Sequence, residues 1–215
     1  MTALDTDKET DTMKDIRTPS ARRRPGILLV LVAAAMLALA GCEGGDLVSY
    51  ELPARQARYT FETTTGDVRT VWEYTSAEAT KDDTPKGSPC IGELVGSSQD
   101  ACRPEPLIFL RYDFGLALDN TARAGAKHDV TIVGYFQERL GRSPEVTSLK
   151  AEATFDGGRT WHRATTRATG RNTFTATIEN PRRDRAAQGV GLRVSAVDNQ
   201  GDTVRQTIPK AYTLR

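Results

Sequence analysis

The sequence predicts an all-β fold: an antiparallel β-sandwich of about eight or nine strands that occupies residues 56–215. Three observations support this prediction. Apolar and polar residues alternate in short runs, turn residues interrupt these runs at regular intervals, and no segment after residue 42 keeps a helical period. Alternation buries one face of a strand and leaves the other in water, as antiparallel sheets allow.

The first two runs predict a hairpin. Residues 58–65 and 68–76 flank Gly66-Asp67, a dipeptide that suits a tight turn. On the second run, one face carries Thr70, Trp72 and Tyr74. The other predicted strands follow in the order 106–114, 128–137, 146–155, 159–167, 172–179, 189–198 and 202–214.

The segment TFDGGRTW (154–161) resembles the Asp-box, a hairpin turn that repeats in sialidase propellers but occurs once here. We expect Asp156 to accept backbone N–H bonds across the turn and Gly158 to supply a positive φ. Trp161 is expected to be buried against the hairpin. A single Asp-box favours a structural turn over a glycosidase site. The strand before it is expected to direct one face into the core, with Leu149, Ala151, Ala153 and Phe155.

A second turn, in SAVDNQGDTV (195–204), contains Asp198 and Gly201. It resembles the hairpin that ends many immunoglobulin-like and fibronectin-like modules. This resemblance implies that the sandwich is of the immunoglobulin or fibronectin type, with Asp198 and Gly201 as structural turn residues.

The N-terminal region predicts an export signal. Three arginines (22–24) precede the apolar run of residues 26–40, which is shorter than the roughly 20 residues that a membrane-spanning helix needs. We expect the polar residues before the arginines to form an extended cytoplasmic region, with either Met1 or Met13 as the start. We expect residues 1–41 to be removed and residues 42–55 to form a tether.

The run ends in Leu39-Ala40-Gly41-Cys42, which resembles the lipobox of bacterial lipoproteins at all four positions. The resemblance implies that Cys42 receives a diacylglyceryl group and becomes the mature N-terminus. It therefore implies a cell-membrane location on the extracytoplasmic face. Two acyl chains hold a protein stably at a membrane, whereas one holds it marginally. The alternatives are a plain signal peptide with an incidental cysteine and a signal anchor that stays uncut.

Cys90 and Cys102 remain once Cys42 carries lipid. In an oxidising compartment we expect them to form a disulfide. This pair lies within the longest irregular segment (76–106), which is polar and rich in Gly, Pro and Ser. Such an insertion is either functional or tolerated.

The residue types that commonly act in catalysis or bind metal ions form no recognisable site in this sequence. The chain has 29 Lys and Arg against 28 Asp and Glu, a balance that does not favour binding to nucleic acid. His128 and His162 lack metal-ligand spacing, no glycine-flanked nucleophilic serine is found, and Asp82-Asp83 falls in a loop. We therefore expect both histidines to have structural or surface roles, and we expect no cofactor and no metal.

Several hairpins together resemble the C-terminal β-sandwich region of large secreted actinobacterial subtilisin-like serine peptidases. The resemblance covers about residues 56–215 and includes a strand that ends in Tyr112-Asp113, the TW hairpin at 154–161 and the final hairpin at 189–212. The peptidase catalytic domain has no counterpart, so the resemblance implies a fold and an accessory role.

Two functional hypotheses follow. The first is a non-catalytic binding or accessory module on the cell surface, with a protein or a secreted peptidase as partner. The loops at one end of the sandwich, or the insertion, would form its contact surface. The second is a hydrolase or a peptidase-derived protein. Because no nucleophile and base are found together, the sequence favours the first.

Overall fold

The computed structural model describes residues 50–84, 90, 101–140 and 142–215. The predicted signal peptide, Cys42, most of the tether and much of the 76–106 insertion lie outside these residues. In the described part of the chain, no helix is long and apolar enough to cross a membrane.

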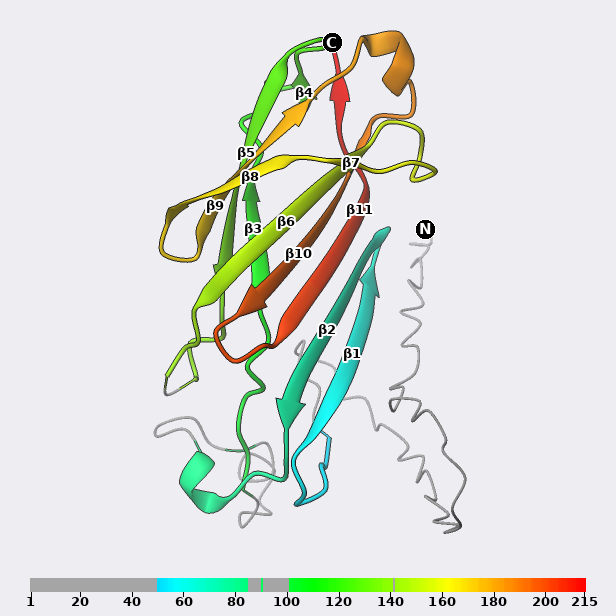
Figure 1. Ribbon diagram of the computed structural model, residues 1–215. Coiled ribbons are helices and arrows are strands. Elements are labelled where there is room, and N and C mark those ends of the chain that lie inside the picture. Colours follow the sequence, from blue (N-terminus) through cyan, green and yellow to red (C-terminus); the bar gives the residue numbers. More distant parts are fainter. Residues whose placement is uncertain (1–49, 85–89, 91–100, 141) are drawn as a thin grey trace, which may run out of the picture.

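Two sheets make up the described part of the chain, which confirms the predicted all-β class and the sandwich (Figure 1). The first sheet has the order β1 (Ala57–Thr65), β2 (Val68–Ser76), β11 (Thr203–Leu214), β10 (Val190–Asp198), β6 (Val146–Thr154) and β7 (His162–Arg163). The short strand β4 (Thr121–Ala122) adds to the end of β11 in parallel. The second sheet has the order β3 (Phe109–Asp113), β5 (Lys127–Tyr135), β9 (Thr173–Glu179) and β8 (Thr165–Gly170). Two 3₁₀ turns, η1 (Lys81–Asp83) and η2 (Arg183–Ala186), lie in loops.

The core lies between the sheets and consists largely of alternate residues of their strands. Val130, Ile132 and Ile178 of the second sheet and Leu192, Val194 and Val204 of the first sheet are almost fully buried. Burial of each such side chain contributes about 1.5–3 kcal/mol. The core is therefore the main source of stability and holds the loops at both ends of the sandwich in place.

The first hairpin forms as predicted. β1 and β2 pair without a register shift, from Ala57 opposite Ser76 to Thr65 opposite Val68. Gly66 has φ of +54°, which the first position of this two-residue turn requires.

The predicted strand over 159–167 was wrong as a single element. The structure divides it into β7, which pairs with β6, and β8, which pairs with β9 in the other sheet. Ala164 lies at the division; it is buried, and its N–H donates to the Ala151 carbonyl at 2.9 Å. The chain therefore crosses between the sheets here. The alternation of apolar and polar residues could not show this crossing, because polar residues continue through it.

Candidate functional site

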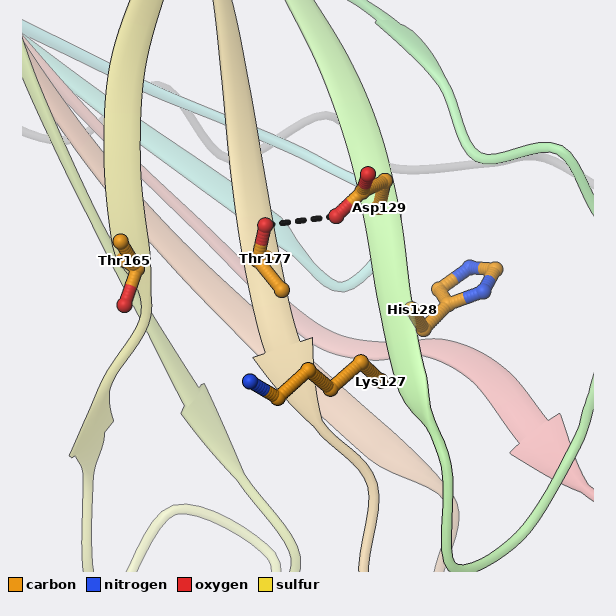
Figure 2. Close-up of a pocket in the computed structure, with 5 residues that line it drawn as sticks. All are labelled: Lys127, His128, Asp129, Thr165 and Thr177. Carbon is orange, nitrogen blue, oxygen red and sulfur yellow. Dashed lines mark hydrogen bonds between the residues drawn. The ribbon is translucent and has the colours of Figure 1, made fainter.

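The two histidines lie in different surroundings, and His128 does not pair with its sequence neighbour Asp129. His128 and Asp129 follow one another on β5, so their side chains leave opposite faces of the sheet. Figure 2 shows the His128 ring directed away from Asp129, whose Oδ1 accepts a 2.6 Å hydrogen bond from the Thr177 hydroxyl. The His128 ring instead packs against Tyr212, with centroids 5.2 Å apart.

The surface around Asp129 is a shallow depression of about 480 Å³, lined by Lys127, His128, Asp129, Thr165 and Thr177 (Figure 2). Lys127 contacts Glu179 at 3.8 Å, and both side chains are strongly exposed. Exposed ion pairs of this kind contribute little to the stability of the folded protein. This depression therefore offers polar contacts but no arranged base and nucleophile. His162 is exposed and stacks on Phe155.

The Asp-box-like turn is held by its own side chains. Asp156 accepts hydrogen bonds from the Thr160 N–H at 2.9 Å and the Thr160 hydroxyl at 2.6 Å. These bonds, with one from Thr154, hold the pKa of the Asp156 carboxyl well below its usual range. Gly158 has φ of +90°, as expected. The Asp156 carboxylate is thus occupied by the turn.

Phe155 is partly buried and packs against the core, on the face that the alternation assigned to it. Trp161, which is expected to be buried against the hairpin, is only partly buried. The Arg193 guanidinium lies over the Trp161 ring at 4.4 Å and also forms a salt bridge of 2.7 Å with Glu152. Trp161 therefore covers the outer face of the first sheet. The turn at Gly157 and Gly158 redirects the chain, so the period of β6 does not extend to Trp161.

The second predicted turn connects three strands. Asp198 Oδ1 accepts the N–H groups of Gln200 and Asp202, both at 2.9 Å, and Gly201 has φ of +83°. Asp202 Oδ1 accepts the Thr75 N–H at 3.0 Å, which joins this turn to β2. Burial, and then the neighbouring Asp198, raises the pKa of Asp202.

The base of the insertion docks on the end of β2. Cys90 and Cys102 are joined by a disulfide. Next to it, the Arg103 guanidinium donates to the Ser76 hydroxyl at 2.9 Å, and that hydroxyl donates to Glu105 at 2.9 Å. Burial raises the pKa of the Glu105 carboxyl. Sequence reasoning missed these three residues, because each is a single polar residue without a recognisable pattern.

The opposite end of the sandwich carries a wide depression of about 1060 Å³. It is lined by Asp119, Thr121, Ala124, Gly125, Arg182, Arg183, Asp184, Ala186, Ala187, Thr213, Leu214 and Arg215. In Figure 1 this is the end at which the C label, β4 and the orange 3₁₀ turn η2 come together. Sequence reasoning missed this site, because its arginines come from separate segments.

Backbone and side-chain bonds fix the segments around this depression. The Ala124 N–H donates to the Arg215 carbonyl, and the Arg215 N–H donates to the Ala122 carbonyl, both at 3.0 Å. Asn180, which is buried, donates to the Arg123 carbonyl at 3.2 Å and accepts from the Tyr212 hydroxyl at 2.8 Å. The loop before η2 is thereby tied to β11 in the core.

Arginine dominates the charge at this end, which we call the arginine end. It comprises Arg123, Arg182, Arg183, Arg185 and Arg215, with the acidic residues Asp119 and Asp184. Hydrogen bonds from the hydroxyl and N–H of Thr121 lower the pKa of Asp119, with a smaller contribution from the Arg215 charge. The side chains of Arg182, Arg183 and Arg185 make no hydrogen bond or salt bridge within the described residues.

These arginines can bind anions. The guanidinium group is planar, remains charged and matches a carboxylate or phosphate with two parallel hydrogen bonds. Leu118, on the loop before Thr121, is fully exposed and offers an apolar contact nearby. Arginine flanked by exposed apolar surface is typical of protein interfaces. Of the described surface, the arginine end is the strongest candidate contact site.

No group of three or more His, Cys, Asp or Glu residues that could hold a metal ion occurs among residues 50–84, 90, 101–140 and 142–215. Comparison with known protein families, curated proteins and solved structures finds no match for this chain.

Proposed function

We propose that this protein is a bacterial lipoprotein, anchored through Cys42 on the extracytoplasmic face of the cell membrane, that serves as a non-catalytic binding or accessory module. The arginine end is the contact surface in this proposal, and its partner is a protein with a complementary acidic surface. The lipobox-like sequence supports the anchor, and the polar, charge-balanced β-sandwich supports a role outside the membrane.

One observation carries the proposal: the first described residues, from Tyr50, and the arginine end lie at opposite ends of the sandwich. The Tyr50 and Tyr74 hydroxyls form a hydrogen bond, and the Glu78 N–H donates to the Pro53 carbonyl at 3.0 Å. The chain therefore enters beside the insertion, only eight residues after Cys42. In Figure 1 the first described residues lie below β1, whereas the C label and η2 lie at the far end. An anchor at Cys42 would leave the arginine end free to meet a partner.

The proposal also assigns the sandwich to the immunoglobulin or fibronectin type. The crossing of the chain between the sheets at Ala164 and the Asp198–Gly201 hairpin support this assignment. The resemblance to accessory regions of secreted peptidases makes a peptidase one candidate partner. The alternative, a hydrolase, gains no support from the histidines, since His128 packs on Tyr212 and His162 stacks on Phe155.

We expect replacement of Cys42 by Ala to remove the lipid and release the protein from the membrane fraction. The physical reason is that the diacyl group provides the membrane affinity. Cell fractionation and mass spectrometry of the mature chain measure both effects, and Ser49→Ala is the matched control. A Cys42→Ala chain that stays uncleaved and membrane-bound would contradict the anchor.

The contact surface is tested by a photo-crosslinking amino acid placed at Ala187, which is exposed and lines the depression. In intact cells we expect a discrete adduct from this position and none from Ser148 on the outer face of the first sheet. The double change Arg182→Glu and Arg183→Glu should remove the adduct, because it reverses two guanidinium charges. The control pair Arg167→Glu and Arg205→Glu, on exposed strand positions, should leave it intact. An adduct that survives the first pair would reject the arginine end.

A further inference from the structure

Leu118 is the most exposed large apolar residue in the described part of the chain, and it is fully accessible to water. The other exposed residue of this kind, Tyr135, is partly covered and packs on Phe109, with ring centroids 5.5 Å apart. Single exposed apolar residues are common on protein surfaces and by themselves indicate no function. The loop that carries Leu118 sets this residue apart.

Leu118 lies at the tip of a loop that is closed by its own hydrogen bonds. The Asn120 N–H donates to the Ala117 carbonyl at 2.9 Å, and the Ala117 N–H donates to the Thr121 carbonyl at 3.1 Å. Asp119 Oδ1 accepts from the N–H and the hydroxyl of Thr121, at 3.3 and 2.6 Å. These bonds fix the backbone on both sides of Leu118, whereas the leucine side chain takes no part in the turn.

The loop is fastened to the arginine end. β4 follows Asn120 in the chain and pairs with the end of β11, and the Thr213 N–H donates to the Asn120 carbonyl at 3.4 Å. Asp119, the residue after Leu118, lines the depression. The same depression is lined by three arginines: Arg182, Arg183 and Arg215. Leu118 therefore stands at the rim of the depression, on a rigid support.

We propose that Leu118 is the apolar anchor of the arginine end: it enters an apolar pocket on the partner protein, and carboxylates around that pocket bind the guanidinium groups. This inference rests on the proposed function, in which the arginine end is the contact surface. It adds the chemistry of the partner, a protein surface with an apolar pocket that acidic side chains surround.

The two kinds of residue make different contributions to such a contact. Charges at the rim of an interface increase the association rate and the specificity, whereas exposed ion pairs contribute little to affinity. Transfer of a leucine side chain from water into an apolar pocket supplies affinity that the arginines lack. Because the loop at Leu118 is already ordered, binding avoids most of the entropy cost of fixing it.

A lipid surface fits the same residues less well. Membrane binding by amphipathic surfaces grows with the apolar area that enters the bilayer, and one leucine offers a small area. Tyr135 does not add to it, because it ends β5, whereas the start of this strand, Lys127, is the part near the arginine end. The observations therefore favour a protein pocket over a lipid contact.

The test uses the full chain in intact cells, with the photo-crosslinking amino acid at Ala187 as the reporter of binding. Leu118→Ala should lower the yield of the adduct by roughly tenfold, because most of the buried apolar area is lost. Leu118→Met keeps the apolar volume and should retain most of the adduct. Leu118→Asp should abolish it, because it places a carboxylate among carboxylates. Tyr135→Ala, the matched control, should leave the yield unchanged.

Thermal melts separate binding from folding. Leu118→Ala should melt at the temperature of the unsubstituted chain, since the side chain is fully exposed. The photo-crosslinking amino acid is also placed at Leu118 itself, and mass spectrometry identifies what it reaches. We expect a peptide of another protein, attached at an apolar residue. Attachment to phospholipid, to a second copy of this chain or within the same chain would overturn the proposal.

Failure of the anchor is distinguishable from failure of the contact surface. If the Ala187 adduct is lost in the double change Arg182→Glu and Arg183→Glu but keeps its full yield in Leu118→Ala, the anchor is wrong and the arginine end remains the contact surface. If Ala187 gives no adduct in the otherwise unsubstituted chain, both are wrong.

Discussion

Trp72→Ala is expected to destabilise the protein by about 3–5 kcal/mol, the range for truncation of a buried aromatic residue. Trp72 is 7% exposed, stacks on Phe61 and meets the edge of Phe109. Its Nε1–H donates to the Ile108 carbonyl at 2.7 Å, so truncation also leaves that carbonyl without its partner. For a domain of this size, the melting temperature should fall by roughly 6–20 °C. Calorimetry of the folded protein measures this shift.

The matched control is the same truncation at Trp161, the other tryptophan of the chain. Its ring is only partly buried and lies under the Arg193 guanidinium, so Trp161→Ala should cost clearly less than Trp72→Ala. Trp72→Phe should cost less than Trp72→Ala, because it keeps one aromatic ring while it removes the N–H and part of the indole volume. Equal melting temperatures for the two alanine variants would contradict the assignment of Trp72 to the core.

The two tryptophans show where sequence reasoning succeeds and where it fails. The alternation of Thr70, Trp72 and Tyr74 gave the buried face of β2 correctly, because a regular strand has a strict period of two. Trp161 lies beyond the end of β6, where the period-two alternation of that strand no longer applies. Two glycines with positive φ, Gly157 and Gly158, turn the chain after Thr154 and change the side to which later residues point. Local pattern therefore cannot assign a face across such a turn.

The candidate site was harder to predict than the fold. Five arginines meet at one end because β4, the loop at Asn180 and the end of β11 are tied together by tertiary hydrogen bonds. Nothing in the local sequence marks these pairings, and β4 has only two residues. The His128-Asp129 dipeptide is the opposite case, in which neighbours in the sequence do not come together in the structure. These two residues are adjacent in the chain, yet strand geometry separates their side chains, so sequence proximity gives no catalytic pair.

Gly191→Ala is expected to prevent stable folding or to lower the melting temperature strongly. The chain at β10 approaches β11 so closely here that an added Cβ would lie 2.6 Å from the Pro209 carbonyl oxygen and 2.6 Å from the Thr154 methyl. The first of these is backbone, which cannot move aside without shifting β11. Forcing extra volume into a packed site costs typically 1–3 kcal/mol and occasionally more, and two contacts under 3 Å place Gly191→Ala at the upper end of about that range.

This close approach has a cause in the pairing of the strands. Between Val190 and Leu192 the register with β11 shifts from Tyr212 to Ile208, so β11 carries extra residues, Pro209 among them, opposite Gly191. Proline is tolerated at such an irregularity because it has no N–H to offer a regular ladder. The bulge directs the Pro209 carbonyl toward Gly191, and only a residue without Cβ fits there. Gly170→Ala is the control, since its methyl would meet Thr173 at an ordinary 3.6 Å. Chemical denaturation of both variants measures the difference. If Gly191→Ala unfolds at the same denaturant concentration as Gly170→Ala, β10 and β11 do not approach each other as closely as the structure shows.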